Sequence, residues 1–279
     1  MKFTYKLLSL KKDVERRNMF FSQPHAELFE VFDAIEAGQN EVDALFDLEK
    51  SSDFYHQVYG RTNNISRGEA ACALSHVAMY RLFLNQSDAD YLVVCEDDAI
   101  LSENFLDLTA IIKHCGQGFE LFFINSYKAE PFDPDVKEMY LEKIANPMQF
   151  FPKKYRSYRV GRIYRNFMNM TVGYVISRHL AKQIVQWVDA GNKVYWLADD
   201  FRLQLSLLGY RKNVIAHVRP ALVRENQALV SNLQHQRDPG VKQIDYKEYG
   251  YQVSAETLKN LKRKYVLKKL KAWLKDKLR

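Results

Sequence analysis

The stretch YLVVCEDDAIL, residues 91–101, contains the pattern that decides the fold. Its first five residues are mainly apolar and predict a buried strand. Three consecutive carboxylates, Glu96, Asp97 and Asp98, follow before apolar sequence resumes at Ala99. Burying even one unpaired carboxylate costs several kcal/mol. A strand that ends on three acids therefore needs a partner that compensates their charge.

Strands and helices alternate on both sides of this stretch. Further strands are expected at 3–10, 121–125, 171–177 and 213–218, and helices at 24–37, 41–59, 66–86, 103–114, 178–190 and 199–209. The polar residues 11–17 are expected to connect the first strand to the first helix. This alternation predicts an α/β fold with a largely parallel central sheet flanked by helices. Ligands of such sheets bind beyond the carboxyl ends of the strands, which is where the three acids lie.

The composition is that of a folded protein with one sizeable core or two small ones. Of 279 residues, 47% are hydrophobic and 13% aromatic, which excludes a disordered chain. The three cysteines form no CxxC pair, so we expect a reducing cytosol rather than a disulfide framework. Lys6 interrupts the short apolar stretch near the start, and no signal peptide is expected there. No apolar run of about 18 residues predicts a transmembrane helix.

The net charge of +7 is concentrated in a basic tail. Residues 254–279 hold ten Lys or Arg and two acidic residues, whereas the body, residues 1–253, is nearly neutral. Apolar residues recur among the basic ones, as in a basic amphipathic helix that lies on an anionic membrane surface. A solubilising helix packed on the body is the alternative. The recurring apolar residues are Leu258, Leu261, Val266, Leu270, Trp273 and Leu278.

A second basic segment, residues 153–165, interleaves Tyr155, Tyr158 and Tyr164 with Lys and Arg. Such a pattern suits nucleic acid, a phosphorylated sugar that stacks on tyrosine, or a solvated loop. The segment falls between the two acidic sites of the sequence. We therefore favour contact with an acceptor, with the segment acting as a lid.

Glu96 and Asp98 form an acid-x-acid pair that suits a hard divalent cation. Two carboxylates hold Mg²⁺ or Mn²⁺ and leave coordination positions open for phosphate oxygens. The alternative without a metal is a solvated turn in which Asp97 or Asp98 caps the next helix. His217 follows another apolar strand and is a candidate third metal ligand, although a core histidine is the usual explanation.

Asp199 and Asp200 form a second acidic site at the start of a predicted amphipathic helix. One acid suffices to cap a helix, which leaves the other to deprotonate a hydroxyl nucleophile. The sequence does not distinguish which of the two is the base.

The stretch RGEAACALSH concentrates polar residues at and along the start of the helix at 66–86. Ser66 and Glu69 have the spacing of a capping box, and the backbone near Gly68 can approach an anion. Ser75 and His76 are candidate site residues, although surface or satisfied core positions are their commoner explanation.

Taken together, these stretches resemble the ordered signature blocks of the glycosyltransferase family 25 lipopolysaccharide-biosynthesis proteins, and collagen galactosyltransferases carry a related domain. The blocks are SRGEAACALSH, VVCEDDAIL, TVGYVISRHLAK and ADDF, and the opening YKLLSLKKDVERR is similar to the family's first strand and Arg-containing loop. They cover about residues 3–225. The stretch LFFINSY departs from the family's more usual Leu-Gly ending, which leaves the sugar open.

The resemblance implies a GT-A-like nucleotide-sugar-binding fold and inverting transfer of a hexose. It implies UDP-galactose as donor, a lipid-linked lipooligosaccharide or lipopolysaccharide as acceptor, and a β-1,4-galactosyltransferase type. Glu96 and Asp98 would then hold Mn²⁺ or Mg²⁺, Asp97 would face the ribose or the sugar, and Asp199 or Asp200 would be the base. Donor binding or support is assigned to Ser9, Arg16, Arg67, Gly68, Glu69, Ser75 and His76.

An enzyme of this kind is expected in the bacterial cytoplasm, peripheral on the inner face of the cytoplasmic membrane. Two other classes compete with this interpretation. A nucleic-acid-binding module would use the basic segments but leaves both acidic sites unexplained, so no nucleic-acid partner is expected. A metal-dependent phosphohydrolase would use the same carboxylates, but the sequence lacks the His-rich cluster that many such enzymes carry.

Overall fold

The computed structural model describes residues 1–125, 151–163, 171–210, 214–226 and 228–229, together with Leu267, Leu270 and Leu274 of the tail. Within them, an eight-stranded sheet has the order β2-β1-β3-β8-β5-β9-β7-β6, and β4 and β10 form a separate pair. The strands are β1 (Phe3–Ser9), β2 (Glu30–Asp33), β3 (Tyr91–Glu96), β4 (Ala99–Leu101), β5 (Leu121–Phe123), β6 (Lys153–Tyr155), β7 (Tyr158–Gly161), β8 (Gly173–Ser177), β9 (Ile215–Arg219) and β10 (Val223–Glu225).

The large sheet is mixed, with most of its strands running the same way. β1 pairs in parallel with β2 and β3, and β5 pairs in parallel with β9. β8 is antiparallel to β3 and β5, and β7 is antiparallel to β9 and β6. Only β7 and β8 therefore run against the other strands of this described sheet. The prediction of a mostly parallel sheet holds for strand direction, while the two reversed strands make several neighbouring pairs antiparallel.

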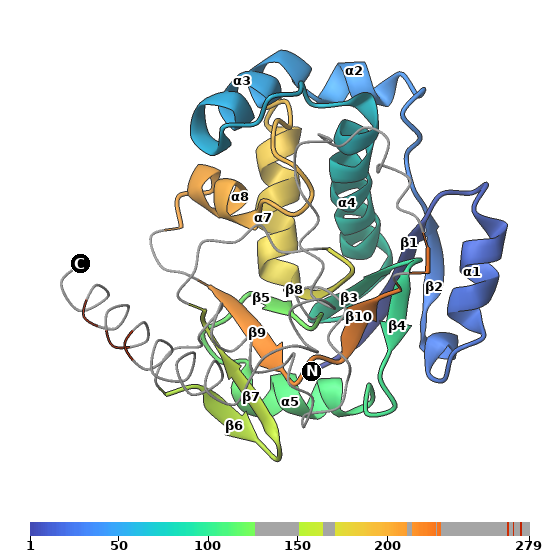
Figure 1. Ribbon diagram of the computed structural model, residues 1–279, viewed down its shortest axis with the longest axis vertical. Helices are drawn as coiled ribbons and strands as arrows, with labels where there is room; N and C mark the ends of the chain where they lie inside the picture. The colour runs from blue at the N-terminus through green and yellow to red at the C-terminus, as the bar shows by residue number, and fades with distance from the viewer. Residues whose placement is uncertain are drawn as a thin grey trace, which may run out of the picture.

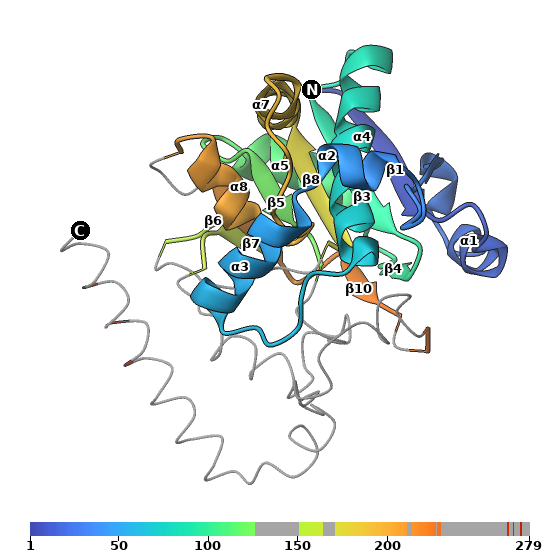
Figure 2. The same ribbon diagram turned by 90° about the horizontal axis from the view of Figure 1, so that it is seen from above.

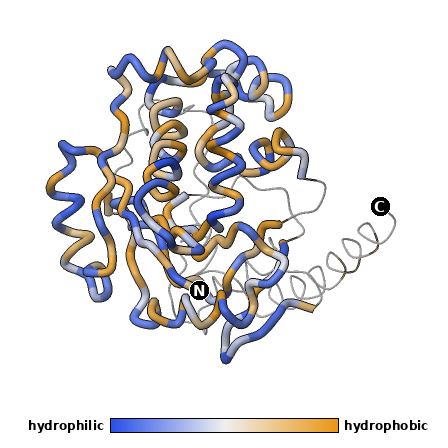
Figure 3. Tube along the Cα trace, turned by 180° about the vertical axis from the view of Figure 1, so that it is seen from behind, coloured by the Kyte–Doolittle hydropathy of each residue, from blue (hydrophilic) through white to orange (hydrophobic). Residues whose placement is uncertain are grey.

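Helices cover both faces of the sheet (Figures 1 and 2). α4 and α7 lie side by side on one face, and α5 covers the other. In Figure 3, hydrophilic and hydrophobic residues alternate along the peripheral helices, as expected when one side of a helix faces the core. The helices are α1 (Val14–Phe21), α2 (Glu41–Leu45), α3 (Leu48–Tyr59), α4 (Arg67–Gln86), α5 (Asp107–Cys115), α7 (Arg178–Asp189) and α8 (Phe201–Leu207), with a 3-10 turn η1 (Ala26–Leu28).

The continuous apolar run of β3 follows from burial on both faces. Leu92 and Val94 belong to the hydrophobic cluster under α4 and α7. Val93 and Cys95 point the other way, into the cluster that contains α5. The alternation places Glu96, the next residue, on the α4 side of the sheet.

The prediction of a helix at 24–37 is wrong. The structure has the turn η1 there, followed by the edge strand β2, which pairs with β1. The apolar residues that suggested helical spacing belong to different surfaces: Phe29 is buried among the α5-side residues, whereas Phe32 packs on the α4-side cluster. Of the polar residues 11–17, predicted to be a connection, residues 14–17 belong to α1, and residues 11–13 connect β1 to it.

The other predicted helices and strands are present with shifted ends. The stretch 41–59 forms α2 and α3, and α4 begins after a Ser66–Glu69 capping box. Of the basic segment 153–165, the described residues form the β6–β7 hairpin, which includes Tyr155 and Tyr158. Tyr164 and the boundary at 253 lie outside the described residues. Among the described residues, no helix has the length and apolar character needed to cross a membrane.

Candidate functional site

The three acids occupy the end of β3 and the turn that leads to β4. Glu96 is the last strand residue, and Asp97 and Asp98 form the turn. The pair β4–β10 supports this turn from the far side, because the backbone N–H of Asn226 donates to the carbonyl oxygen of Asp98 at 2.7 Å. The acids are thus held on a rigid strand end rather than in a free loop.

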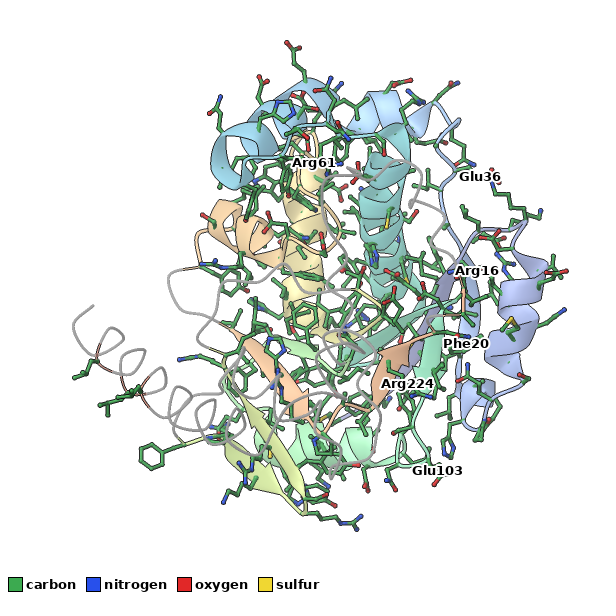
Figure 4. The ribbon with its side chains drawn as sticks, in the orientation of Figure 1. Arg16, Phe20, Glu36, Arg61, Glu103 and Arg224 are labelled. Atoms are coloured by element: carbon green, nitrogen blue, oxygen red, sulfur yellow. The ribbon has the colours of Figure 1, made fainter. Side chains whose placement is uncertain are left out.

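Asp97 is buried and fully engaged by the protein. It accepts hydrogen bonds from Ser9 Oγ and Arg16 Nε, both at 2.6 Å, and Arg16 Nη2 lies 2.5 Å from its Oδ1. Arg16 lies on the sheet-facing side of α1 (Figure 4). Both oxygens of Asp97 therefore tie the acidic turn to β1 and α1. This geometry favours an anchoring role over contact with a ribose or sugar.

Asp98 differs from its neighbour because one of its carboxylate oxygens has no hydrogen-bond partner among the described residues. Its Oδ2 lies 3.3 Å from Arg16 Nη2, whereas its Oδ1 is buried without a hydrogen-bond partner. Burial, followed by the nearby Glu96 carboxylate, raises the pKa of Asp98 to about 7, although Arg16 acts to lower it. A cation placed beside Asp98 would remove both penalties.

Glu96 faces α4 and is held by two side chains. Thr171 Oγ1 donates to Glu96 Oε1, and His76 Nε2 lies 3.7 Å from the same oxygen. Burial alone raises the pKa of Glu96, but His76, Thr171 and Arg16 outweigh it and lower the pKa. Glu96 is consequently a carboxylate at neutral pH.

Glu96 and Asp98 fit a divalent cation with oxygen ligands. They supply two carboxylates from one strand end, and Asp98 Oδ1 is a buried acceptor that lacks a donor. Hard ions such as Mg²⁺ and Mn²⁺ are bound by one or two carboxylates and by oxygens of the substrate. The donor set therefore suits the kind of ion that the sequence predicted.

The two acids of the second site have separate environments. Asp200 is 1% exposed and caps α8, with Oδ1 accepting from the backbone N–H of Leu203 at 3.0 Å. Its Oδ2 accepts from the hydroxyls of Tyr55 at 2.9 Å and Tyr59 at 3.2 Å. Asp199 is only half-buried. Because Asp200 is almost completely buried and Asp199 is partly exposed, Asp199 is the better candidate for a group that meets a substrate.

A short series of contacts connects the two acidic sites. Phe201, which follows Asp200, lies with its ring 5.3 Å from that of Tyr174. The Tyr174 hydroxyl is 2.6 Å from His76 Nδ1, and His76 reaches toward Glu96 with its other nitrogen. Both acidic sites therefore lie on the α4 side of the sheet.

Most of the RGEAACALSH block serves the structure. Glu69 completes the capping box with Ser66 and accepts two hydrogen bonds of 2.9 Å from Arg61. Arg67 pairs with Asp43 and donates to the Ala37 carbonyl oxygen.

Further along the block, His76 and Cys72 lie close to Glu96. Ser75 is fully buried, donates to the Ala71 carbonyl and accepts from the backbone N–H of Ile35. Gly68 is the second residue of α4. The structure thus brings His76 to Glu96, and Ser9 and Arg16 to the acidic turn, but binds Arg67, Glu69 and Ser75 elsewhere.

His217 does not reach the acidic turn, so the prediction that it is a metal ligand is wrong. It lies on β9, in register with Phe123 of β5, and stacks on that ring at 5.2 Å between centroids. The strands β8 and β5 lie between β9 and β3. The three spacings between neighbouring strands, at about 4.8 Å each, place β9 roughly 14 Å from β3. Burial lowers the pKa of His217 to about 3, so it remains neutral.

Sequence reasoning missed Cys72, Thr171 and Tyr174, which surround His76 and Glu96. One signal was present: Cys72 precedes His76 by four residues, a spacing that places both on one face of a helix. Thr171 and Tyr174 reach the site only through the antiparallel pairing of β8 with β3, which the sequence did not predict.

Residues 3–201 match the family model described as glycosyltransferase family 25 (LPS biosynthesis protein). No curated protein matches the sequence.

Solved structures show distant similarity. A Drosophila β-1,4-galactosyltransferase 7 in complex with manganese, UDP-Gal and xylobiose is 11% identical, with 91% of this chain and 82% of that chain covered and a TM-score of 0.39. A Mycobacterium tuberculosis glucosyl-3-phosphoglycerate synthase with Mn²⁺ and UDP is 14% identical, with coverages of 77% and 68% and a TM-score of 0.35. S. aureus TarS is 13% identical, with coverages of 81% and 60% and a TM-score of 0.37. At these scores the similarities establish no shared activity.

Proposed function

The chain belongs to glycosyltransferase family 25, and we propose that it transfers a hexose with inversion from a UDP-sugar to a glycan acceptor in a metal-dependent reaction on a GT-A-like fold. The proposed donor is UDP-galactose, and the proposed acceptor is a lipid-linked lipooligosaccharide or lipopolysaccharide precursor. The observation that carries the proposal is the unsatisfied, buried Asp98 Oδ1 beside Glu96 at the end of β3.

In this proposal the acidic turn binds the donor's pyrophosphate end. Glu96 and Asp98 would hold Mn²⁺ or Mg²⁺, which when bound offsets the negative charge that develops on the leaving nucleoside diphosphate. Arg16 supports this geometry, because it holds Asp97 and Asp98 together and limits the repulsion between adjacent carboxylates. Glu96 is kept in place by Thr171.

Asp199 is the proposed base. Transfer with inversion requires one group that removes a proton from the acceptor hydroxyl as that oxygen attacks the anomeric carbon. Asp200 is unsuited to this role, since its oxygens already accept from a backbone N–H and two tyrosine hydroxyls. It would act instead as a positioning residue that fixes the start of α8 and thereby its neighbour Asp199.

The tail is proposed to hold the enzyme at the inner face of the cytoplasmic membrane, where a lipid-linked acceptor would lie. Ten basic residues in 254–279 favour an anionic surface. Leu267, Leu270 and Leu274 are helical residues with exposed side chains, and their spacing places them on one helix face. An exposed apolar row among lysines is the pattern of a helix that lies in a membrane interface.

Release of UDP from a panel of UDP-hexoses tests the proposed function. We expect turnover with Mn²⁺ that EDTA abolishes, and a loss of about 100-fold or more for Asp98→Asn. Asp88→Asn is the matched control, because it makes the same chemical change on an exposed residue that precedes the other end of β3. Turnover of another UDP-hexose would correct the sugar alone. Neither binding nor turnover of any UDP-sugar would overturn the proposal.

A further inference from the structure

Cys72, His76 and Glu96 bring three potential metal ligands together beside the acidic turn. Cys72 and His76 are four residues apart on α4, so both project from the same helix face. Glu96 meets them from the end of β3. One ligand atom from each residue, a sulfur, a nitrogen and an oxygen, lies within 4.8 Å of the other two.

His76 supplies the observation that points to a ligand. The residue is only 3% exposed, yet within the described part of the chain its Nε2 is buried without a hydrogen-bond partner. Nε2 lies 3.7 Å from Glu96 Oε1, which is beyond hydrogen-bond distance. Two ligands of a tetrahedral zinc ion, with bonds of about 2.1 Å, are roughly 3.4 Å apart. The observed separation, which also falls within the range of an ion pair, is close to that of two atoms that bind one ion.

The surrounding residues orient the three ligands as outer-shell groups do in zinc sites. His76 Nδ1 lies 2.6 Å from the Tyr174 hydroxyl, which in turn lies 2.7 Å from the Tyr80 hydroxyl. A proton on Nδ1 would leave the Nε2 lone pair directed at the cluster. Thr171 donates to Glu96 and restricts its rotation. Cys72 and Glu96 are only partly buried.

We propose that Cys72, His76 and Glu96 bind a borderline-soft transition-metal ion of the Zn²⁺ or Co²⁺ class. A thiolate and an imidazole select such ions, whereas Mg²⁺ and Mn²⁺ prefer oxygen ligands. Three protein ligands leave a fourth position for water or a substrate oxygen. This site differs from the proposed donor-metal site of Glu96 and Asp98, because its two other ligands come from α4 rather than from Asp98. It shares Glu96, so an ion held here competes with that pair.

Cobalt binding tests the proposal without any sugar donor. The full-length protein, freed of metal by a chelator, is titrated with Co²⁺ and followed by absorbance. We expect one equivalent to produce a thiolate-to-cobalt charge-transfer band, which Zn²⁺ then removes. Cys72→Ser should abolish the band, and His76→Gln should weaken cobalt binding beyond the about 10–100-fold loss that outer-shell changes cause.

Control variants separate this site from others. Cys115→Ala removes a buried thiol on the opposite face of the sheet and should leave the band intact. Asp98→Asn should also leave it intact, even if that variant abolishes sugar transfer. Circular dichroism confirms that each variant is folded. Absence of the band in the parent protein, its persistence in folded Cys72→Ser, or its loss in Asp98→Asn would overturn the assignment.

Discussion

Asp97 and Asp98 are adjacent acids whose surroundings give them different properties. Arg16 and Ser9 satisfy both oxygens of Asp97, so its charge is neutralised within the protein. Asp98 keeps one buried oxygen without a donor, and burial raises its pKa. A buried strand can therefore end on three acids for two reasons: one acid anchors the turn, and the other two are proposed to bind a cation.

The assignment of roles at the second acidic site can be tested by paired substitutions. Asp199→Asn should lower turnover by about 100-fold or more, because it removes the proposed base. Asp200→Asn should lower the free energy of unfolding by about 1–3 kcal/mol, because Tyr55 and Tyr59 lose a charged acceptor. Steady-state kinetics and chemical denaturation measure the two effects. Full turnover in Asp199→Asn would contradict the assignment.

His217 should make the protein sensitive to acid. Burial lowers its pKa from 6.5 to about 3, so the unfolded chain binds a proton that the folded chain does not. The folded state consequently loses stability as the pH falls from 6.5 toward 3, by about 2 kcal/mol between pH 7 and pH 5. In His217→Gln, the drop in the free energy of unfolding over that interval should shrink by this amount. Equal drops in both proteins, measured by urea denaturation, would show that His217 does not carry the effect.

At the scale of elements, α4 positions the site because its start is fixed and its middle is buried. The capping box satisfies backbone groups at the first turn, and Arg61 holds Glu69 from the loop after α3. Small residues such as Ala70 and Ala73 let the helix pack closely on its neighbours. The helix then presents Cys72 and His76 to the end of β3.

The capping residues of α4 should affect stability rather than catalysis. Ser66→Ala should lower the free energy of unfolding by about 1 kcal/mol, because one backbone N–H loses its acceptor. Glu69→Gln keeps the length of the side chain but loses the ion pair with Arg61, so it should lower stability while the KM for donor is unchanged. Thermal denaturation and donor titration measure these effects. A raised KM at full stability would instead place Glu69 in donor binding, as the family resemblance implied.

The strand β2 shows why a short element at the edge of the sheet was predicted with the wrong type. Its four residues, Glu30–Asp33, follow a 3-10 turn, and the apolar pattern across the two mimics a helix. Pairing with β1 decides the outcome, since an edge position on an existing sheet supplies hydrogen bonds that local sequence cannot encode. By contrast, α4 and α7 have caps and long amphipathic patterns, and the sequence predicts both.

At the scale of the whole molecule, the reversed strand β8 assembles the site. Its antiparallel pairing places Tyr174 between β3, which carries Glu96, and β5, and the backbone N–H of Glu96 donates to the carbonyl oxygen of Val172 just before the strand. Tyr174 then contacts His76, while Thr171, just before the strand, contacts Glu96. The contribution of β8 therefore depends on strand order and direction together.

Removal of the tail should separate membrane attachment from chemistry. A chain that ends at residue 253 should lose binding to anionic vesicles, since each basic residue near such a surface contributes about 1 kcal/mol. Transfer to a soluble acceptor should persist, whereas transfer to a lipid-linked acceptor should fall. Vesicle sedimentation at low and high salt and assays with both acceptors measure the effects. Equal losses with the two acceptors would indicate that the tail packs on the body.

The sequence by itself determined the α/β class, the buried strand β3 and the two acidic sites, because hydrophobic periodicity and helix caps are local properties. It also identified the family through ordered blocks. The tertiary structure decided which acids are occupied: Asp97 by Arg16 and Asp200 by two tyrosines. It decided as well that His76 meets Cys72 and Glu96 while His217 does not. Such distinctions depend on strand order and on side chains far apart in sequence, which only packing brings together.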